Sequence, residues 1–118
     1  MNTIHLVKEW FNKWESGEYL KLRLSDNFKH TSPFGTIDGK ETYLNLVRDN
    51  EDKFLGHTFT IHDIIEGDGK ACVRYTTNQG TDFSMDVSEW FYIKDDKIDQ
   101  IFSYYHIGEI REERRLNE

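Results

Sequence analysis

The residue best suited to chemistry is Glu89, because it stands in a strand-like segment whose other residues on the same side are apolar. Alternate residues of a strand share a face, and the row that contains Glu89 also holds Phe83, Met85, Val87, Phe91 and Ile93. An unpaired carboxylate is costly to bury, so Glu89 must find a partner, take up a proton or face a cavity. Glu89 is therefore a candidate site residue.

Another residue able to do chemistry is His106, near the end of the last apolar segment, 98–107. Histidine can move protons near neutral pH. If the strands that carry Glu89 and His106 are neighbours, one side chain can orient the other and the two can act together. The same two residues also suit a structural hydrogen bond that lines a pocket without reacting, and the sequence leaves both interpretations open.

A pocket rim is indicated by His30-Thr31-Ser32-Pro33-Phe34-Gly35, which holds the only proline of the chain. Proline fixes φ and pushes the preceding residue into an extended conformation, so this segment predicts a placed turn. His30 and Ser32 are therefore candidate substrate-binding residues, and a half-exposed hydrogen-bonding role is the alternative for His30. Four aromatic residues complete this set, with core packing as the alternative: Trp10, Trp14, Tyr75 and Tyr104.

Other kinds of site find no support in the sequence. His57 and His62 are five residues apart in a strand-like segment, so they point to opposite faces and cannot share a metal. There is no glycine-rich phosphate loop, no GxSxG motif and no Cys-His arrangement. We therefore expect neither a metal nor a cofactor, and we predict that Asp38 caps a helix.

The first half of the chain is predicted to be helical. Apolar residues recur at three- and four-residue steps over 3–15, and a short second helix is predicted over 19–24. A brief strand over 28–31 precedes the proline turn. Capping-box spacing from Asp38 to Glu41 then predicts a further helix that extends to Phe54.

The second half is predicted to be a four-stranded antiparallel meander. Its segments 57–65, 70–77, 83–93 and 98–107 are rich in β-branched and aromatic residues, and three short turns separate them. Helices followed by a sheet predict the α+β class. In the strand 83–93, the side opposite Glu89 carries Trp90 and Tyr92, which indicates a second buried interface and hence a homodimer formed through the sheet.

Length and charge limit the classes of protein. The 118 residues predict one domain over 1–108, followed by a charged tail over 109–118. The net charge of −7 disfavours nucleic acid and anionic membranes as partners. No apolar run approaches the roughly 20 residues that span a bilayer. With a lone Cys72 and no secretory signal pattern, we expect a cytoplasmic protein.

The order of these elements resembles the nuclear transport factor 2-like superfamily, which includes SnoaL-like polyketide cyclases and ketosteroid isomerases. The specific parts are Trp14-Glu15-Ser16-Gly17-Glu18, Ser32-Pro33-Phe34-Gly35 with Gly39, and the hairpin from Glu89-Trp90-Phe91-Tyr92-Ile93 to Lys97-Ile98. The resemblance covers nearly the whole chain. It implies a cystatin-like cone in which N-terminal helices pack on a curved antiparallel sheet and enclose a pocket, with dimerisation through the convex face.

The resemblance carries over only part of the catalytic machinery. Ketosteroid isomerases place an Asp directly before the Pro-x-Gly turn, and the matching Ser32 cannot serve unaided as a base at neutral pH. Trp10 stands at the position of their helix-one oxyanion Tyr. Glu89 matches their protonated carboxylic acid in kind, and His106 stands where SnoaL-like cyclases carry an acid/base Asp.

Two functions follow as hypotheses, and the ligand expected in the pocket is a small, mainly apolar organic molecule. In the first, the protein is a cofactor-independent isomerase, cyclase or dehydratase in which Glu89 donates a hydrogen bond to an oxyanion and His106 moves the proton. In the second, it is a non-catalytic ligand-binding or protein-interaction module. Ser32 and Trp10, which replace the base and the tyrosine of ketosteroid isomerases, favour the second.

Overall fold

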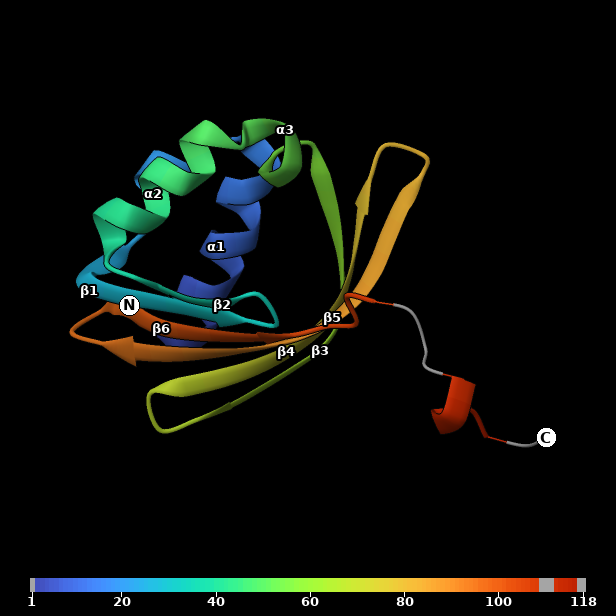
Figure 1. Ribbon diagram of the computed structural model, residues 1–118. Coiled ribbons are helices and arrows are strands. Elements are labelled where there is room, and N and C mark those ends of the chain that lie inside the picture. The colour runs from blue at the N-terminus through green and yellow to red at the C-terminus, as the bar shows by residue number, and fades with distance from the viewer. Residues whose placement is uncertain (1, 109–111, 117–118) are drawn as a thin grey trace.

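A helical layer covers one face of a curved six-stranded sheet in the computed structural model, which describes residues 2–108 and 112–116 (Figure 1). The helices are α1 (Thr3–Ser16), a 3-10 turn (Tyr19–Lys21), α2 (Lys40–Asp49) and α3 (Glu51–Phe54), with a further 3-10 turn at Glu112–Arg114. The strands are β1 (Leu24–Ser32), β2 (Gly35–Asp38), β3 (His57–Gly67), β4 (Lys70–Gln79), β5 (Phe83–Lys94) and β6 (Lys97–Tyr104).

The predicted α+β class is confirmed, and the sheet is mixed rather than wholly antiparallel. Its strand order is β2-β1-β6-β5-β4-β3, and the predicted meander forms the part from β3 to β6. Two features were not predicted: β2, which pairs antiparallel with β1, and the parallel pairing of β1 with β6. β1 and β6 are separated by most of the chain, so no local sequence pattern marks their pairing.

Helix α1 begins and ends at recognisable caps. The side chain of Asn2 accepts a hydrogen bond of 2.8 Å from the main-chain N–H of His5, and Gly17 ends the helix with a φ of 79°. The helix buries one face against the sheet, and Trp10 and Trp14 lie on that face. The predicted boundaries, 3–15, differ from the observed ones by one residue.

Three local predictions in the first half are wrong. The expected helix over 19–24 is only the 3-10 turn, because Leu24 already pairs with Ile98 as the first residue of β1. Asp38 does not cap α2, because it is the last residue of β2 and pairs there with Lys29 of β1. The N-cap of α2 is Gly39, which provides no side-chain hydrogen bond. The predicted single helix is interrupted at Asn50, so that α2 and α3 are separate.

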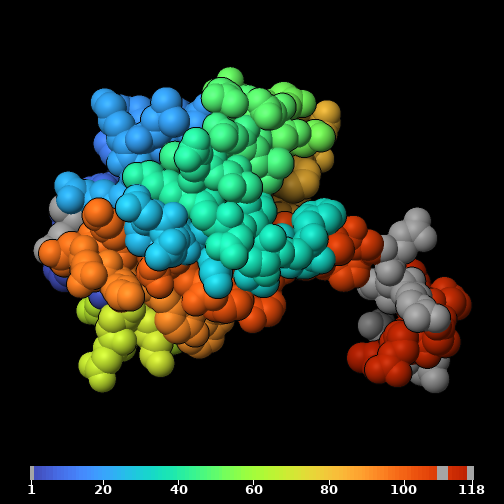
Figure 2. Space-filling model, turned by 60° about the vertical axis from the view of Figure 1, so that its left-hand side comes forward, coloured from blue at the N-terminus to red at the C-terminus, as the bar shows by residue number. Residues whose placement is uncertain are grey.

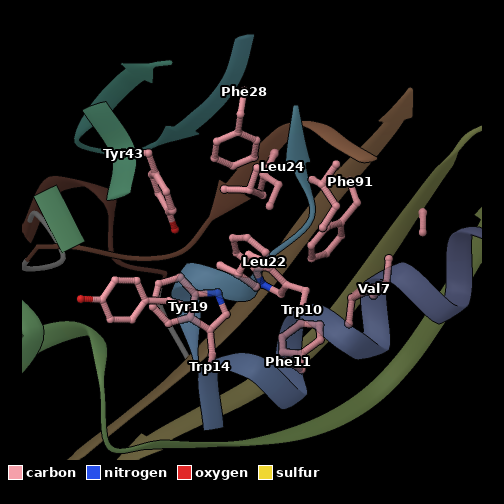
Figure 3. Close-up of a cluster of buried hydrophobic side chains, with 14 of the residues drawn as sticks. Val7, Trp10, Phe11, Trp14, Tyr19, Leu22, Leu24, Phe28, Tyr43 and Phe91 are labelled. Carbon is pink, nitrogen blue, oxygen red and sulfur yellow. The ribbon is translucent and has the colours of Figure 1, made fainter. Parts of the chain in front are cut away.

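The core is a cluster of buried hydrophobic side chains, rich in aromatic rings, between the helices and the sheet (Figure 3). The Trp10 ring lies at its centre, with centroid distances of 5.6 Å to Trp14, 5.8 Å to Phe91, 6.4 Å to Phe28 and 6.5 Å to Tyr43. Such ring pairs add to the stability that burial provides. Trp10 and Trp14 therefore pack in the core.

Figure 2 shows the α2 segment over one side of the molecule, beside β1 and β2, with which it is in contact. No helix in the described ranges is long and apolar enough to cross a bilayer. Part of the predicted charged tail, residues 109–111, 117 and 118, lies outside the described residues. In the described part of that tail, Arg115 forms an ion pair with Glu112 at 3.4 Å.

Candidate active site

A cavity of about 670 Å³ lies between the helices and the inner face of the sheet. Its size suits a small organic molecule, and aromatic and aliphatic side chains form most of its lining. Seven of the eight residues predicted for the site line it, and these are Trp10, Trp14, His30, Ser32, Tyr75, Glu89 and His106. The structure therefore brings together most of the predicted set around a single cavity.

Tyr104 is the exception, because it lies outside this cavity. Its side chain is 59% exposed on the opposite side of the sheet, where it lines a shallow hollow with Trp90, Tyr92 and Phe102. The prediction that Tyr104 is on the pocket wall is therefore not what the structure shows. The neighbouring Tyr105 lines the cavity instead.

Glu89 lies on the buried side of β5 and is only 4% exposed. Its carboxyl oxygen Oε2 is hydrogen-bonded to the hydroxyl of Ser103, which lies opposite it on β6. Its other oxygen, Oε1, is buried and has no hydrogen-bond partner among the described residues. A buried, unpartnered carboxyl oxygen in a cavity wall is a group that a ligand can satisfy.

Burial raises the pKa of Glu89 to about 7. Desolvation is the largest cause, since it disfavours the charged form, while the polar groups of Ser103, Tyr75 and Trp10 lower the pKa in part. The carboxyl can thus be neutral or charged near neutral pH. This is the range in which a proton donor or acceptor is most useful.

His30 is the second titratable group next to this carboxyl. Its ring stacks on Tyr43 at a centroid distance of 5.3 Å, and its Nε2 lies 3.4 Å from the hydroxyl oxygen of Ser103. Burial lowers the pKa of His30 to about 4, opposed in part by a hydrogen bond with its own main chain. The imidazole is therefore neutral at pH 7.

Ser103 is the residue that sequence reasoning missed, although it is 3% exposed and joins Glu89 to His30. The predicted partner of Glu89 was His106, but in the described structure the carboxyl is hydrogen-bonded to Ser103. His106 follows the end of β6 and is exposed, although it lines the same cavity. The two predicted catalytic residues therefore share a cavity without a direct hydrogen bond.

At another part of the cavity wall, a hydrogen-bonded histidine holds β3 to α3. The ring Nε2 of His57 donates to the main-chain oxygen of Lys53 at 2.9 Å, so Nδ1 accepts from the Thr77 hydroxyl at 2.7 Å. His62 instead bonds Thr76 and is exposed. In the part of the chain that the structure describes, no group of three metal-ligating side chains is close enough to hold an ion.

A curved mixed sheet with helices on one face is also the fold of solved structures called NTF2-like. The model of the SnoaL-like domain matches residues 7–101, and the chain belongs to this family. None of the curated proteins with which the chain was compared matches it.

Solved structures share the fold at low sequence identity. An NTF2-like protein of unknown function from Cytophaga hutchinsonii has a TM-score of 0.76 and 21% identity, with 90% of this chain and 91% of that chain covered. A Kribbella flavida protein that bears the name "putative ketosteroid isomerase" has a TM-score of 0.74 and 13% identity, with 97% and 87% covered. A SnoaL-like protein of unknown function from Burkholderia thailandensis has a TM-score of 0.73 and 18% identity, with 86% and 92% covered.

Proposed function

We propose that this protein binds a small, mainly apolar organic molecule whose oxygen atom hydrogen-bonds Glu89, and that it catalyses an acid/base isomerisation, cyclisation or dehydration of that molecule. The observation that carries the proposal is Oε1 of Glu89, a buried carboxyl oxygen without a partner among the described residues, in the wall of an aromatic cavity. A neutral carboxyl there can donate to a carbonyl oxygen and stabilise the negative charge that develops on it.

In this reaction Glu89 holds the substrate oxygen and His106 moves the proton. For an isomerisation, a C–H bond next to the carbonyl breaks, its electron pair moves toward the carbonyl oxygen, and the proton returns at a different carbon. Neither an oxidant nor a further reactant takes part. His106 suits the second role because it lines the cavity and is exposed, so it can exchange protons with solvent.

The catalytic proposal is tested with 2-tetralone, a bicyclic ketone whose α-hydrogens exchange for deuterium when an enol forms. We expect the protein to accelerate this exchange, measured by proton NMR in D2O, and Glu89→Gln to reduce the acceleration at least about 100-fold. His106→Ala tests the proton-moving role, and Glu66→Gln, which changes an exposed carboxylate on β3, is the matched control. If the Glu89→Gln/His106→Ala double variant retains full exchange, the catalytic proposal is wrong.

The alternative function is a binding module of the same fold, favoured by Ser32 in place of a catalytic base. Calorimetric titration with 2-tetralone and 2-naphthol separates the two functions. Binding of either molecule without accelerated exchange supports the module. Absence of binding by both contradicts the proposed ligand class.

We also propose a homodimer formed through the sheet face that points away from the helices. Trp90 and Tyr104, 40% and 59% exposed, lie in the hollow of about 390 Å³ on that face. We expect Trp90→Lys to raise the dimer dissociation constant at least about tenfold in sedimentation equilibrium, because the substitution places a charge in an apolar interface. Leu20→Lys, at an exposed apolar residue outside the sheet, is the control. A wild-type protein that is monomeric even at high protein concentration would contradict the proposal.

A further inference from the structure

The hydroxyl of Ser103 lies between two groups and has only one proton to donate. Oε2 of Glu89 is on one side of it and Nε2 of His30, at the long hydrogen-bond distance of 3.4 Å, is on the other. When Ser103 donates to one of them, it can bond the other only by accepting. Glu89, Ser103 and His30 thus form a hydrogen-bond chain. The direction in which its hydrogen bonds are donated is linked to the atoms of Glu89 and His30 that carry protons.

We propose that His30 and Ser103 are positioning residues, which determine whether Oε1 of Glu89 offers the ligand a hydrogen-bond donor or an acceptor. This inference rests on the proposed function, since it concerns the same carboxyl. It adds a ligand class: molecules of one apolar skeleton that carry either a carbonyl or a hydroxyl group at the same place.

In the first arrangement, the chain runs toward His30. Glu89 carries its proton on Oε2 and donates to Ser103, Ser103 donates to Nε2, and the imidazole proton is on Nδ1. Oε1 is then a carbonyl-type oxygen that accepts a hydrogen bond from a ligand hydroxyl. The hydrogen bond between His30 and its own main chain favours this arrangement, because a bond that raises the pKa of the ring is one in which a ring N–H donates.

In the second arrangement, the chain runs toward Glu89. Nε2 carries the imidazole proton and donates to Ser103, Ser103 donates to Oε2, and a neutral carboxyl carries its proton on Oε1. That proton can be donated to a ligand carbonyl. Between the two arrangements the proton count is unchanged, since one proton leaves Nδ1 and one arrives at Oε1.

Without a ligand, the direction of the chain depends on pH. A carboxylate can only accept, so ionised Glu89 requires Ser103 to donate to Oε2, and His30 can then bond Ser103 only by donating from Nε2. For neutral Glu89, a proton on Oε1 would lack a partner among the described residues, whereas a proton on Oε2 is bonded to Ser103. Protonation of Glu89 should therefore move the His30 proton from Nε2 to Nδ1.

Other ionisable groups also surround this carboxyl, and Tyr75 interacts with it directly. Tyr43 of α2 and Tyr75 of β4 interact with Glu89, Tyr105 after β6 interacts with both tyrosines, and burial raises the pKa of Tyr43 and Tyr75. Lys53, His57 and His106 are the remaining ionisable residues that line the cavity. The ring of His57 is held by its own two hydrogen bonds. The NMR signals of His57 are identified as those that disappear in the His57→Gln variant.

The test is nitrogen-15 NMR of the histidine rings in the unliganded protein, which reports the tautomer of His30 directly. We expect Nε2–H at pH 9 and Nδ1–H at pH 5.5, with a midpoint at about pH 7, where Glu89 titrates. Ser103→Ala and Glu89→Gln should each abolish the pH-dependent change, and Ser103→Thr should restore it. Ser88→Ala, a change on the opposite face of β5, should preserve it. The same tautomer at both pH values in the wild-type protein overturns the inference.

Ligands provide the second arm of the test. At pH 6, bound 2-naphthol should hold His30 as Nδ1–H and bound 2-tetralone should convert it to Nε2–H, and identical tautomers in the two complexes would contradict the ligand class. If neither probe binds, the proposed function fails while the titration of the unliganded protein still decides whether the chain switches.

Discussion

Glu89→Gln is expected to raise the free energy of unfolding by about 3 kcal/mol at pH 8 and to change it little at pH 4.5. The pKa of Glu89 is raised from 4.5 to about 7 by burial, so the folded protein binds a proton over a pH range in which the unfolded chain has lost it. Folding stability therefore falls as pH rises from 4.5 to 7. A pKa that differs by one between the folded and unfolded states changes the stability by about 1.4 kcal/mol, and above pH 7 the loss is constant.

The measurement is urea unfolding followed by tryptophan fluorescence at the two pH values. Glutamine has nearly the shape of glutamic acid and no charge, so its amide escapes the desolvation cost that the carboxylate meets. Glu66→Gln changes an exposed carboxylate and should leave the stability nearly unchanged at both pH values. A Glu89→Gln protein that is no more stable than the wild type at pH 8 would show that the carboxylate is well solvated or paired in the folded state.

The sequence predicted those parts of the fold that depend on neighbouring segments. The turns between β3 and β6 are short, so each hairpin is encoded locally, and α1 has its own caps. The pairing of β1 with β6 joins Leu24 to Ile98, and no pattern in either segment specifies the other. Helix α2 was located correctly in spite of a wrong cap, because the burial of Tyr43 and Val47 positions it.

In the site, Glu89 was found from alternation along β5, whereas Ser103 was missed because of a register shift. The end pair of the hairpin, Lys94 with Lys97, would place residue 102 opposite Glu89 in a regular ladder. The ladder shifts by one residue between Tyr92 and Ile93, so Ser103 faces Glu89 instead. The same irregularity directs Tyr104 outward. A shift of one residue exchanges the two faces of a strand, and alternation counted from Ile98 cannot reveal it.

His30→Phe is expected to raise the free energy of unfolding by about 3 kcal/mol relative to the wild type at pH 4.5. Above pH 7 the titration of His30 no longer contributes to the difference between the two proteins. Burial lowers the pKa of His30 from 6.5 to about 4, so the unfolded chain binds a proton in this range that the folded protein rejects. The wild type therefore loses stability as pH falls from 6.5 toward 4, and the variant does not. Phenylalanine keeps an aromatic ring against Tyr43.

This penalty is the counterpart of the one at Glu89: both lower the stability, and between pH 4.5 and 6.5 their opposite pH dependences cancel. In that range the folded protein holds its proton on Glu89 and the unfolded chain holds one on His30, so the two states bind equal numbers of protons at these sites. In His30→Phe only Glu89 still titrates in this range, so the stability of the variant should fall by about 2 kcal/mol relative to the wild type from pH 4.5 to 6.5. Glu89→Gln should show the opposite slope. Urea unfolding across this range, with His62→Phe as the exposed-histidine control, tests both, and parallel curves for the two variants would contradict the opposite pKa shifts of Glu89 and His30.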